Sequence, residues 1–161
     1  MFIKVKDKNQ IETVEKLAKD IWIEHYTPII GKSQISYMLD KFQSAAAISS
    51  QIDKDMEYFL ILDEGKEIGY MAVEQRKDEL FLSKIYIMAS MRGRGLGKKA
   101  VDFTVKIARK RKLGKIILTV NKNNLSSVKA YEKMGFVKRG TVIQDIGNGF
   151  VMDDYRMEKV I

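Results

Sequence analysis

The chain has 161 residues, a length typical of one domain with its own core. It contains no cysteine and one histidine, His25, which excludes disulfides, thiol nucleophiles and a metal site built from cysteines or clustered histidines. The formal net charge of +8 leaves three partner classes open: nucleic acid, an anionic membrane surface and an anionic small ligand.

The N-terminal third of the chain is predicted to be helical. Its first residues contain no apolar run of signal-peptide length, and no stretch approaches the roughly 20 apolar residues that cross a bilayer. We therefore expect a cytoplasmic protein with no membrane partner. Apolar residues spaced by three or four predict a helix over residues 11–26. The stretch ISYMLDKFQSAAAISSQI (35–52) predicts a second helix or a helix pair.

The middle of the chain changes to strand patterns. EYFLILDEGKEIGYMAVEQ (57–75) contains two apolar runs around a turn and predicts a β-hairpin. ELFLSKIYIMAS (79–90) predicts a third strand. It leads into SMRGRGLGKKA (90–100), where glycines alternate with basic residues, and helical spacing returns over 95–112.

The last third of the chain completes an α/β (more closely, α+β) pattern. KIILTV (115–120) is continuous and rich in β-branched residues, as in a strand covered on both faces. NNLSSVKAYEKMGF (123–136) predicts a helix capped by asparagine and stopped by Gly135. Two strands around a Gly-Asn-Gly turn are predicted over 136–160. We therefore expect one domain over residues 1–161, with a mixed central sheet flanked by helices.

The glycine-rich loop is predicted to bind phosphate. It follows a strand and opens a helix, where unpaired N–H groups and the positive end of the helix dipole attract anions. A Walker loop would need Ser or Thr in place of Lys99, and a dinucleotide loop needs a glycine spacing different from that of Gly93, Gly95 and Gly97. Ten basic residues between Arg92 and Lys115, opposed only by Asp102, add long-range attraction or form a solvated helix face.

A third template fits the loop. Residues 92–97 (RGRGLG) match Arg/Gln-x-x-Gly-x-Gly/Ala, the acetyl-CoA loop of the GCN5-related N-acetyltransferase (GNAT) superfamily. A second signature, Asn-x-x-Ala/Ser-x-x-x-Tyr-x-x-x-Gly-Phe, resembles five positions here: Asn124, Ser127, Tyr131, Gly135 and Phe136. The resemblance covers residues 55–161. The KIYI strand and the FVMDDYRMEK ending resemble the PaiA-type polyamine acetyltransferases.

The resemblance implies a single GNAT-like domain with a splayed cofactor cleft. Acceptor-side helices would occupy about 10–50, the acetyl-CoA-binding core about 55–140 and the C-terminal hairpin about 136–160. The implied activity is transfer of an acetyl group from acetyl-CoA to a primary amine of a small molecule, a polyamine among them, or of a protein. Direct attack in a ternary complex would release CoA. No metal is expected.

The resemblance also assigns roles to residues. The Tyr131 hydroxyl, protonated at neutral pH, would donate a proton to the departing CoA thiolate. The implied cofactor contacts comprise main-chain groups of the strand, the loop with the start of its helix, and two residues of the stretch 123–136. They are Ile85, Ile87, Arg92, Gly93, Arg94, Gly95, Gly97, Lys98, Asn124 and Ser127. Without the resemblance, Asn124 would be interpreted as a helix cap and Tyr131 as a residue packed on the sheet.

The acceptor side is less defined. Trp22, His25 and Tyr26 are candidates for the acceptor pocket. The PaiA-type strand carries a Glu near the position of Ser83, so no general base stands out here. The candidates for this base are Glu24, His25, Glu79 and Asp145. The final hairpin offers an edge through which a homodimer could form.

Two other functions stay open at this point. The first is a non-catalytic CoA-sensing or regulatory module on the same fold. The second is a nucleic-acid-binding domain driven by the basic cluster. The chain lacks both the exposed aromatic interleaving of single-strand binders and a recognisable groove-reading helix, so we expect no nucleic acid partner.

Overall fold

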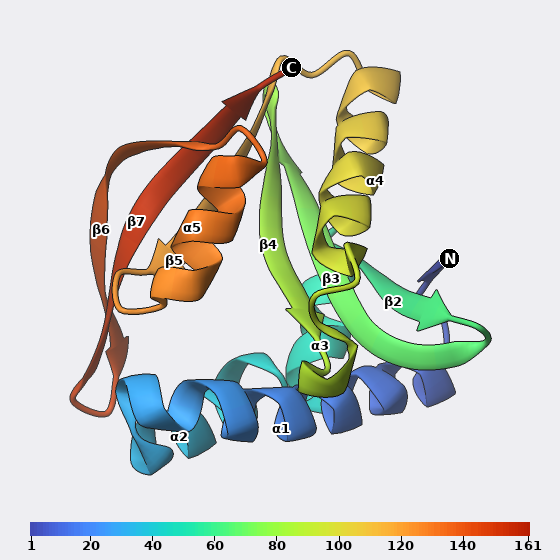
Figure 1. Cartoon of the computed structure of the whole chain (residues 1–161). Coiled ribbons are helices and arrows are strands. Elements are labelled where there is room, and N and C mark those ends of the chain that lie inside the picture. The colour runs from blue at the N-terminus through green and yellow to red at the C-terminus, as the bar shows by residue number, and fades with distance from the viewer. The chain divides into compact units, whose positions relative to one another are not determined.

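The computed structural model describes all residues, 1–161, and confirms the predicted α/β class with a mixed sheet (Figure 1). In chain order the elements are β1 (Phe2–Lys4), α1 (Lys8–Ile30), α2 (Lys32–Phe42), α3 (Ala45–Asp53), β2 (Glu57–Asp63), β3 (Lys66–Arg76), β4 (Glu79–Ile87), the 3₁₀ turn η1 (Ala89–Met91), α4 (Leu96–Lys110), β5 (Lys115–Asn121), α5 (Leu125–Lys133), β6 (Val137–Gly147) and β7 (Phe150–Val160). Only β1 and η1 were not predicted, because each is too short to show a period.

The sheet has seven strands in the order β1-β2-β3-β4-β5-β7-β6. Strands β4 and β5 are parallel, whereas the pairs β1–β2, β2–β3, β5–β7 and β6–β7 are antiparallel. The chain divides into two compact units. The first comprises Met1–Glu74 with Lys84–Ala100, and the second comprises Gln75–Ser83 with Val101–Ile161. Strand β4 contributes residues to both units.

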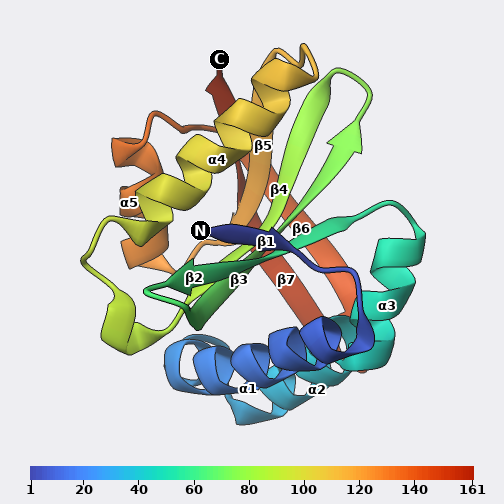
Figure 2. The same ribbon diagram turned by 90° about the vertical axis from the view of Figure 1, so that its right-hand side faces the viewer.

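In the first unit, helix α1 is longer than the predicted 11–26. It begins with a capping box in which the Gln10 N–H donates to Asp7 Oδ1 (2.9 Å) and the Asp7 N–H donates to Gln10 Oε1 (3.1 Å). It continues through Pro28 and ends at the C-cap Gly31. The φ of this residue is 86°, a conformation that glycine adopts without strain. The predicted helix pair over 35–52 is confirmed as α2 and α3, and Figure 2 shows α2 beside α1.

In the second unit, β5 is buried at three successive positions, Ile116, Ile117 and Leu118, which confirms a strand covered on both faces. Helix α5 ends as predicted at Gly135, with a φ of 94°. The Lys159 ammonium donates to the Met134 carbonyl at 2.7 Å and satisfies one of the last carbonyls of α5. None of the helices is long and apolar enough to cross a membrane.

Candidate functional site

The glycine-rich loop has the predicted strand–loop–helix arrangement. Gly93 and Gly95 have φ values of 79° and 74°, which side chains other than glycine rarely adopt. The first intrahelical bond of α4 runs from the Lys99 N–H to the Gly95 carbonyl (3.1 Å). The N–H groups at the start of α4 therefore precede the helical hydrogen-bond ladder, as in helix N-termini that bind anions.

Gly97 differs from the other loop glycines. It lies in the first turn of α4 and does not have a positive φ. A Cβ added there would meet no other atom of the protein within 4 Å. Because a helical glycine is less stable than alanine, neither backbone geometry nor packing explains this residue. The backbone at this position is open to close approach by an outside group.

The two loop arginines make contacts within the first unit. Arg92 Nε donates to the Ile87 carbonyl (3.2 Å), and Arg92 Nη1 lies 3.3 Å from His25 Nδ1. Since a guanidinium can only donate, Nδ1 is the acceptor in this contact. Arg94 forms a long ion pair with Asp63 at 3.7 Å. The loop is thus connected to β4, to α1 and to the end of β2.

The backbone of β4 before the loop is fixed by a close approach to β3. The Met88 N–H donates to the Ile68 carbonyl (2.9 Å). At Gly69, an added Cβ would lie 3.1 Å from the Ile87 Cα and well inside the van der Waals distance of the Tyr86 carbonyl oxygen. Only glycine fits there without displacing the strand that contains Ile85 and Ile87.

The three predicted acceptor-side residues come together on α1. The ring centroid of Trp22 lies 4.8 Å from that of Tyr26, and the His25 ring lies 4.7 Å from Tyr26. Tyr86 of β4 completes the cluster, 5.2 Å from Trp22 and 6.1 Å from Tyr26. The prediction missed Tyr86, although its place in the strand before the loop could have indicated it. Trp22 is buried, whereas His25, Tyr26 and Tyr86 are half-buried.

Lys84 is a second residue that the sequence analysis missed. Its side chain is buried on β4, and its ammonium donates to Gln51 Oε1 (2.7 Å) and to the Tyr58 hydroxyl. No carboxylate lies within ion-pair distance. Burial lowers the pKa of Lys84 to about 7 and raises the pKa of Tyr58. The first unit therefore contains an amine that is only partly charged at neutral pH.

Replacing Lys84 by methionine is expected to stabilise the protein at pH 7 by about 2 kcal/mol, because a buried charge with no counter-charge is removed. In the wild type, the free energy of unfolding should rise with pH between about 7 and about 10. In this window the unfolded state holds a proton on Lys84 that the folded state has lost. Urea unfolding at several pH values should show this rise in wild type and in the exposed-site control Lys66→Met. A rise that persists in Lys84→Met contradicts the assignment.

Helix α5 contains the second predicted group of site residues. Asn124 is buried at the N-cap position, and Ser127 and Tyr131 are half-buried. The Tyr131 ring packs edge-on against the buried Phe136 at 5.5 Å. The prediction of a side-chain asparagine cap is wrong. Asn124, with φ −84° and ψ 68°, makes no cap bond and instead accepts from Ser126 Oγ (3.4 Å).

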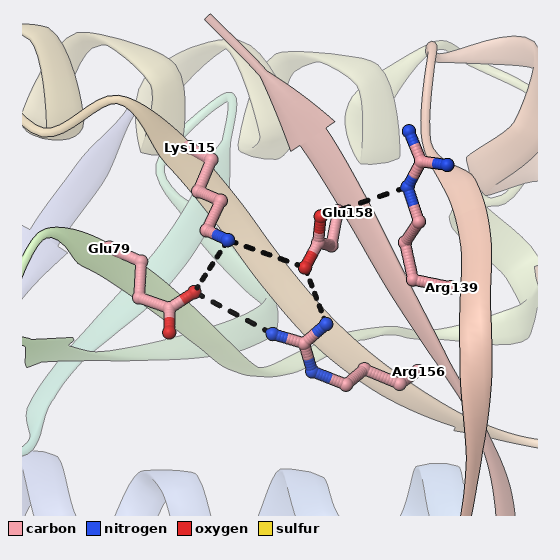
Figure 3. A network of polar contacts seen from close by, with 5 residues as sticks. All are labelled: Glu79, Lys115, Arg139, Arg156 and Glu158. Carbon is pink, nitrogen blue, oxygen red and sulfur yellow. Dashed lines mark hydrogen bonds and ion pairs between the residues drawn. The ribbon is translucent and has the colours of Figure 1, made fainter.

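The candidate general bases differ in their surroundings. Glu24 is exposed, and Asp145 accepts from the Gly147 N–H (2.8 Å) within the final turn. His25 Nδ1 faces Arg92. Glu79 lies in a network of five charged residues, in which its Oε2 is 3.7 Å from both Lys115 and Arg156 (Figure 3). This distance is an ion-pair contact without a hydrogen bond. No group of three or more His, Cys, Asp or Glu residues could hold a metal ion.

Comparison with known proteins supports the resemblance. The model of the "Acetyltransferase (GNAT) family" matches residues 14–136. Mycothiol acetyltransferases of Corynebacterium glutamicum are 35% identical over 86 residues, which cover 52% of this chain and 29% of theirs. This chain thus spans less than a third of the curated relatives it matches.

Solved structures show the same fold. The PaiA N-acetyltransferase of Thermoplasma acidophilum in complex with coenzyme A has a TM-score of 0.84 at 18% identity, covering 100% of this chain and 99% of that one. A GCN5-related N-acetyltransferase of Rhodopseudomonas palustris has a TM-score of 0.84 at 14% identity, covering 100% and 95%.

Proposed function

Because the chain belongs to the acetyltransferase (GNAT) family, we propose that it transfers an acetyl group from acetyl-CoA to a primary amine of a small molecule or a protein. The observation that carries this proposal is the glycine-rich loop, with its N–H groups ahead of α4 and the open space at Gly97. A polyamine is one candidate acceptor, suggested by the KIYI and FVMDDYRMEK stretches. The proposed enzyme forms one domain over residues 1–161.

The loop residues fit the phosphates of coenzyme A. Backbone N–H groups from Arg92 to Lys98 would bind the pyrophosphate, and Arg92 and Arg94 would add positive charge. Arg94 would exchange or share its ion pair with Asp63 when a phosphate binds. The basic residues that follow in α4 have an anionic partner in the same ligand, so nucleic acid is not needed to explain them.

The remaining predicted residues would act near the thioester. Main-chain groups of Ile85 and Ile87 would pair with the pantetheine arm. Asn124 and Ser127 are the cofactor contacts predicted on α5. Acetyl-CoA supplies the activated acyl group when bound. Tyr131 would hold a proton at its phenolic oxygen and donate it to the sulfur as the C–S bond breaks. Trp22, His25 and Tyr26 would line the acceptor side.

The open space at Gly97 gives a direct test. Gly97→Ala should raise the free energy of unfolding by about 0.5–1 kcal/mol, since alanine is the better helix former. The same methyl group would occupy the space proposed for phosphate, and we expect acetyl-CoA affinity to fall at least tenfold in calorimetry. Gly114→Ala, also uncrowded, is the matched control and should bind normally.

The activity itself is tested by CoA release with a panel of primary amines that includes spermidine and a peptide with a free N-terminus. Acetylated product identified by mass spectrometry supports the proposal. A wild-type protein that binds no acetyl-CoA at high micromolar concentration contradicts it. Binding with no turnover on any amine favours the CoA-sensing module instead.

A further inference from the structure

Strand β6 is one of the two edges of the sheet, and it differs from the other edge in length. The sheet begins with β1, which has three residues, and ends with β6, which has eleven and contains no proline. An edge strand presents a row of backbone N–H and C=O groups that can pair with another chain, and proteins commonly prevent this with short strands or proline. The edge at β1 is short, whereas the edge at β6 is long.

The centre of β6 is regular. Register shifts occur at 138–140 and at 145–147, and between them residues 140–145 pair without interruption with 151–156 of β7. Figure 1 shows β6 beside β7, with no strand on its outer side. In an antiparallel ladder, alternate residues direct their N–H and C=O groups to the same neighbour, so half of this stretch directs them outward. The stretch can therefore form a second ladder.

Apolar side chains are exposed on the same hairpin. Val142 and Ile143 of β6 are 36% and 71% exposed, and Val151 of β7 is 49% exposed. Of the eight large hydrophobic residues that are exposed in the chain, five lie in β6 or β7. Thr141, Val142 and Ile143 are three β-branched residues in succession, a type that packs well against a neighbouring strand. This edge is therefore suited to pairing with another strand.

The charges of β6 match those of a second, antiparallel β6. Lys138 and Arg139 lie near its start, and Asp145 lies near its end. When two copies pair antiparallel about a two-fold axis, the start of each strand meets the end of the other. Arg139 is three positions before Val142, and Asp145 is three positions after it. With Val142 on the axis, each arginine therefore comes opposite the aspartate of the other copy.

Both charged side chains are accessible for this contact. The Arg139 side chain is 55% exposed, and its Nε lies 3.8 Å from Glu158 Oε2, which is a long ion pair. Asp145 is exposed, and its Oδ1 accepts from the Gly147 N–H, which leaves Oδ2 for a guanidinium. An arginine and an aspartate can therefore meet at each end of the paired strands.

The alternation of side chains narrows the register. Residues that are directly opposite in an antiparallel pair lie on the same face of the sheet, so the two-fold axis passes through a residue position. Of the axes within 140–145, only the one at Val142 brings Arg139 opposite Asp145. In this register Val142 meets its own copy on one face of the sheet. Ile143 meets Thr141 of the other copy on the opposite face.

We propose that two copies of this chain associate through β6, antiparallel and with Val142 on the two-fold axis. The contact is isologous and occupies the long edge of each copy. The edge that remains, β1, has only three residues, so the assembly stops at two copies. This homodimer does not depend on the proposed acetyl transfer.

Sedimentation velocity without any ligand tests the dimer. At high micromolar concentration, wild type should have twice the 18.5 kDa mass of the chain. Ile143→Lys should be monomeric, because it places an ammonium group from each copy in the contact. Val160→Lys is the matched control, since Val160 is similarly exposed (75%) but lies in β7, and this variant should stay dimeric. Because both residues are exposed, both variants should keep the wild-type unfolding midpoint.

Charge reversal tests the register. Arg139→Glu alone brings acidic side chains together at both ends of the contact, and Asp145→Arg alone brings basic ones together. Each should raise the dissociation constant of the dimer about tenfold, since like charges opposite one another destabilise strand pairing. The double variant restores the opposite charges and should return to within about threefold of wild type. A register about a different residue does not predict this rescue.

Disulfide cross-linking identifies the residue on the axis. The chain has no cysteine, so a single introduced cysteine can link only to its own copy. Val142→Cys should form a disulfide-linked dimer on mild oxidation, because opposite Cβ atoms in paired strands lie about 5 Å apart. Val160→Cys should stay largely unlinked under the same conditions.

The outcomes are distinct. A wild type that is monomeric at high micromolar concentration overturns the proposal and leaves the β6 edge to a strand of a different protein. A dimer that persists in Ile143→Lys, or a Val142→Cys that links no faster than Val160→Cys, overturns it as well. Failure of the double charge reversal to restore the dimer rejects the register about Val142. None of these measurements uses acetyl-CoA or turnover, so the proposed function is tested separately.

Discussion

Replacing Gly69 by alanine is expected to destabilise the protein by roughly 3 kcal/mol or more, the effect of forcing an atom into a packed site. The added Cβ would overlap the Tyr86 carbonyl oxygen and approach the Ile87 Cα and Cγ1 at 3.1 and 3.3 Å. Two of these atoms are backbone, so no side-chain rotation relieves the overlap. Strand β4 would have to move away from β3.

Urea unfolding followed by circular dichroism measures this effect. Gly140→Ala is the matched control, since it is also a strand glycine and its added Cβ would meet nothing within 4 Å. The control should unfold like wild type or slightly later. Any folded fraction of Gly69→Ala should also bind acetyl-CoA more weakly, because Ile85 and Ile87 are in the displaced strand. An unfolding midpoint equal to that of the control would show that β4 moves at little cost.

Tyr131→Phe is expected to lower kcat by roughly 10²–10⁴-fold, the range for loss of a general acid. The ring packing on Phe136 at 5.5 Å is retained, so the unfolding midpoint should change little. Affinity for acetyl-CoA should stay within about threefold of wild type, because the proton matters only as the sulfur departs.

Tyr155→Phe, a half-buried tyrosine of β7, serves as the control for removing a hydroxyl from the second unit. Single-turnover rates should separate the two variants, with only Tyr131→Phe impaired. Equal rates would mean that Tyr131 contributes packing alone. If wild type binds acetyl-CoA but shows no turnover, neither variant has a rate to compare, and the CoA-sensing module is favoured.

The long elements could be predicted from the sequence because each has a regular apolar period. The ends of α1 could not, since they depend on capping: Asp7 and Gln10 start the helix before its apolar face begins, and Gly31 stops it after Pro28. The asparagine cap of α5 failed for a related reason. Its residue type suits a cap, but the Asn124 side chain makes no cap bond and accepts from the Ser126 hydroxyl instead.

Some residues of the candidate site could likewise be predicted from local patterns, whereas others could not. The loop and the Asn124–Tyr131 spacing are local patterns, and they led to the family. Lys84 was missed because its properties depend on residues distant in sequence. Lys84 owes its surroundings to Gln51 and Tyr58, 33 and 26 positions away.

At position 97, fold stability favours alanine and ligand binding favours glycine, and the two residues differ by one methyl group. A screen of random variants for heat resistance alone should favour alanine there, since the free protein has room for the methyl group and the helix gains from it. The same screen carried out in the presence of acetyl-CoA should retain glycine. The preferred residue at position 97 would then report which ligand was present during selection, independently of any assay of turnover.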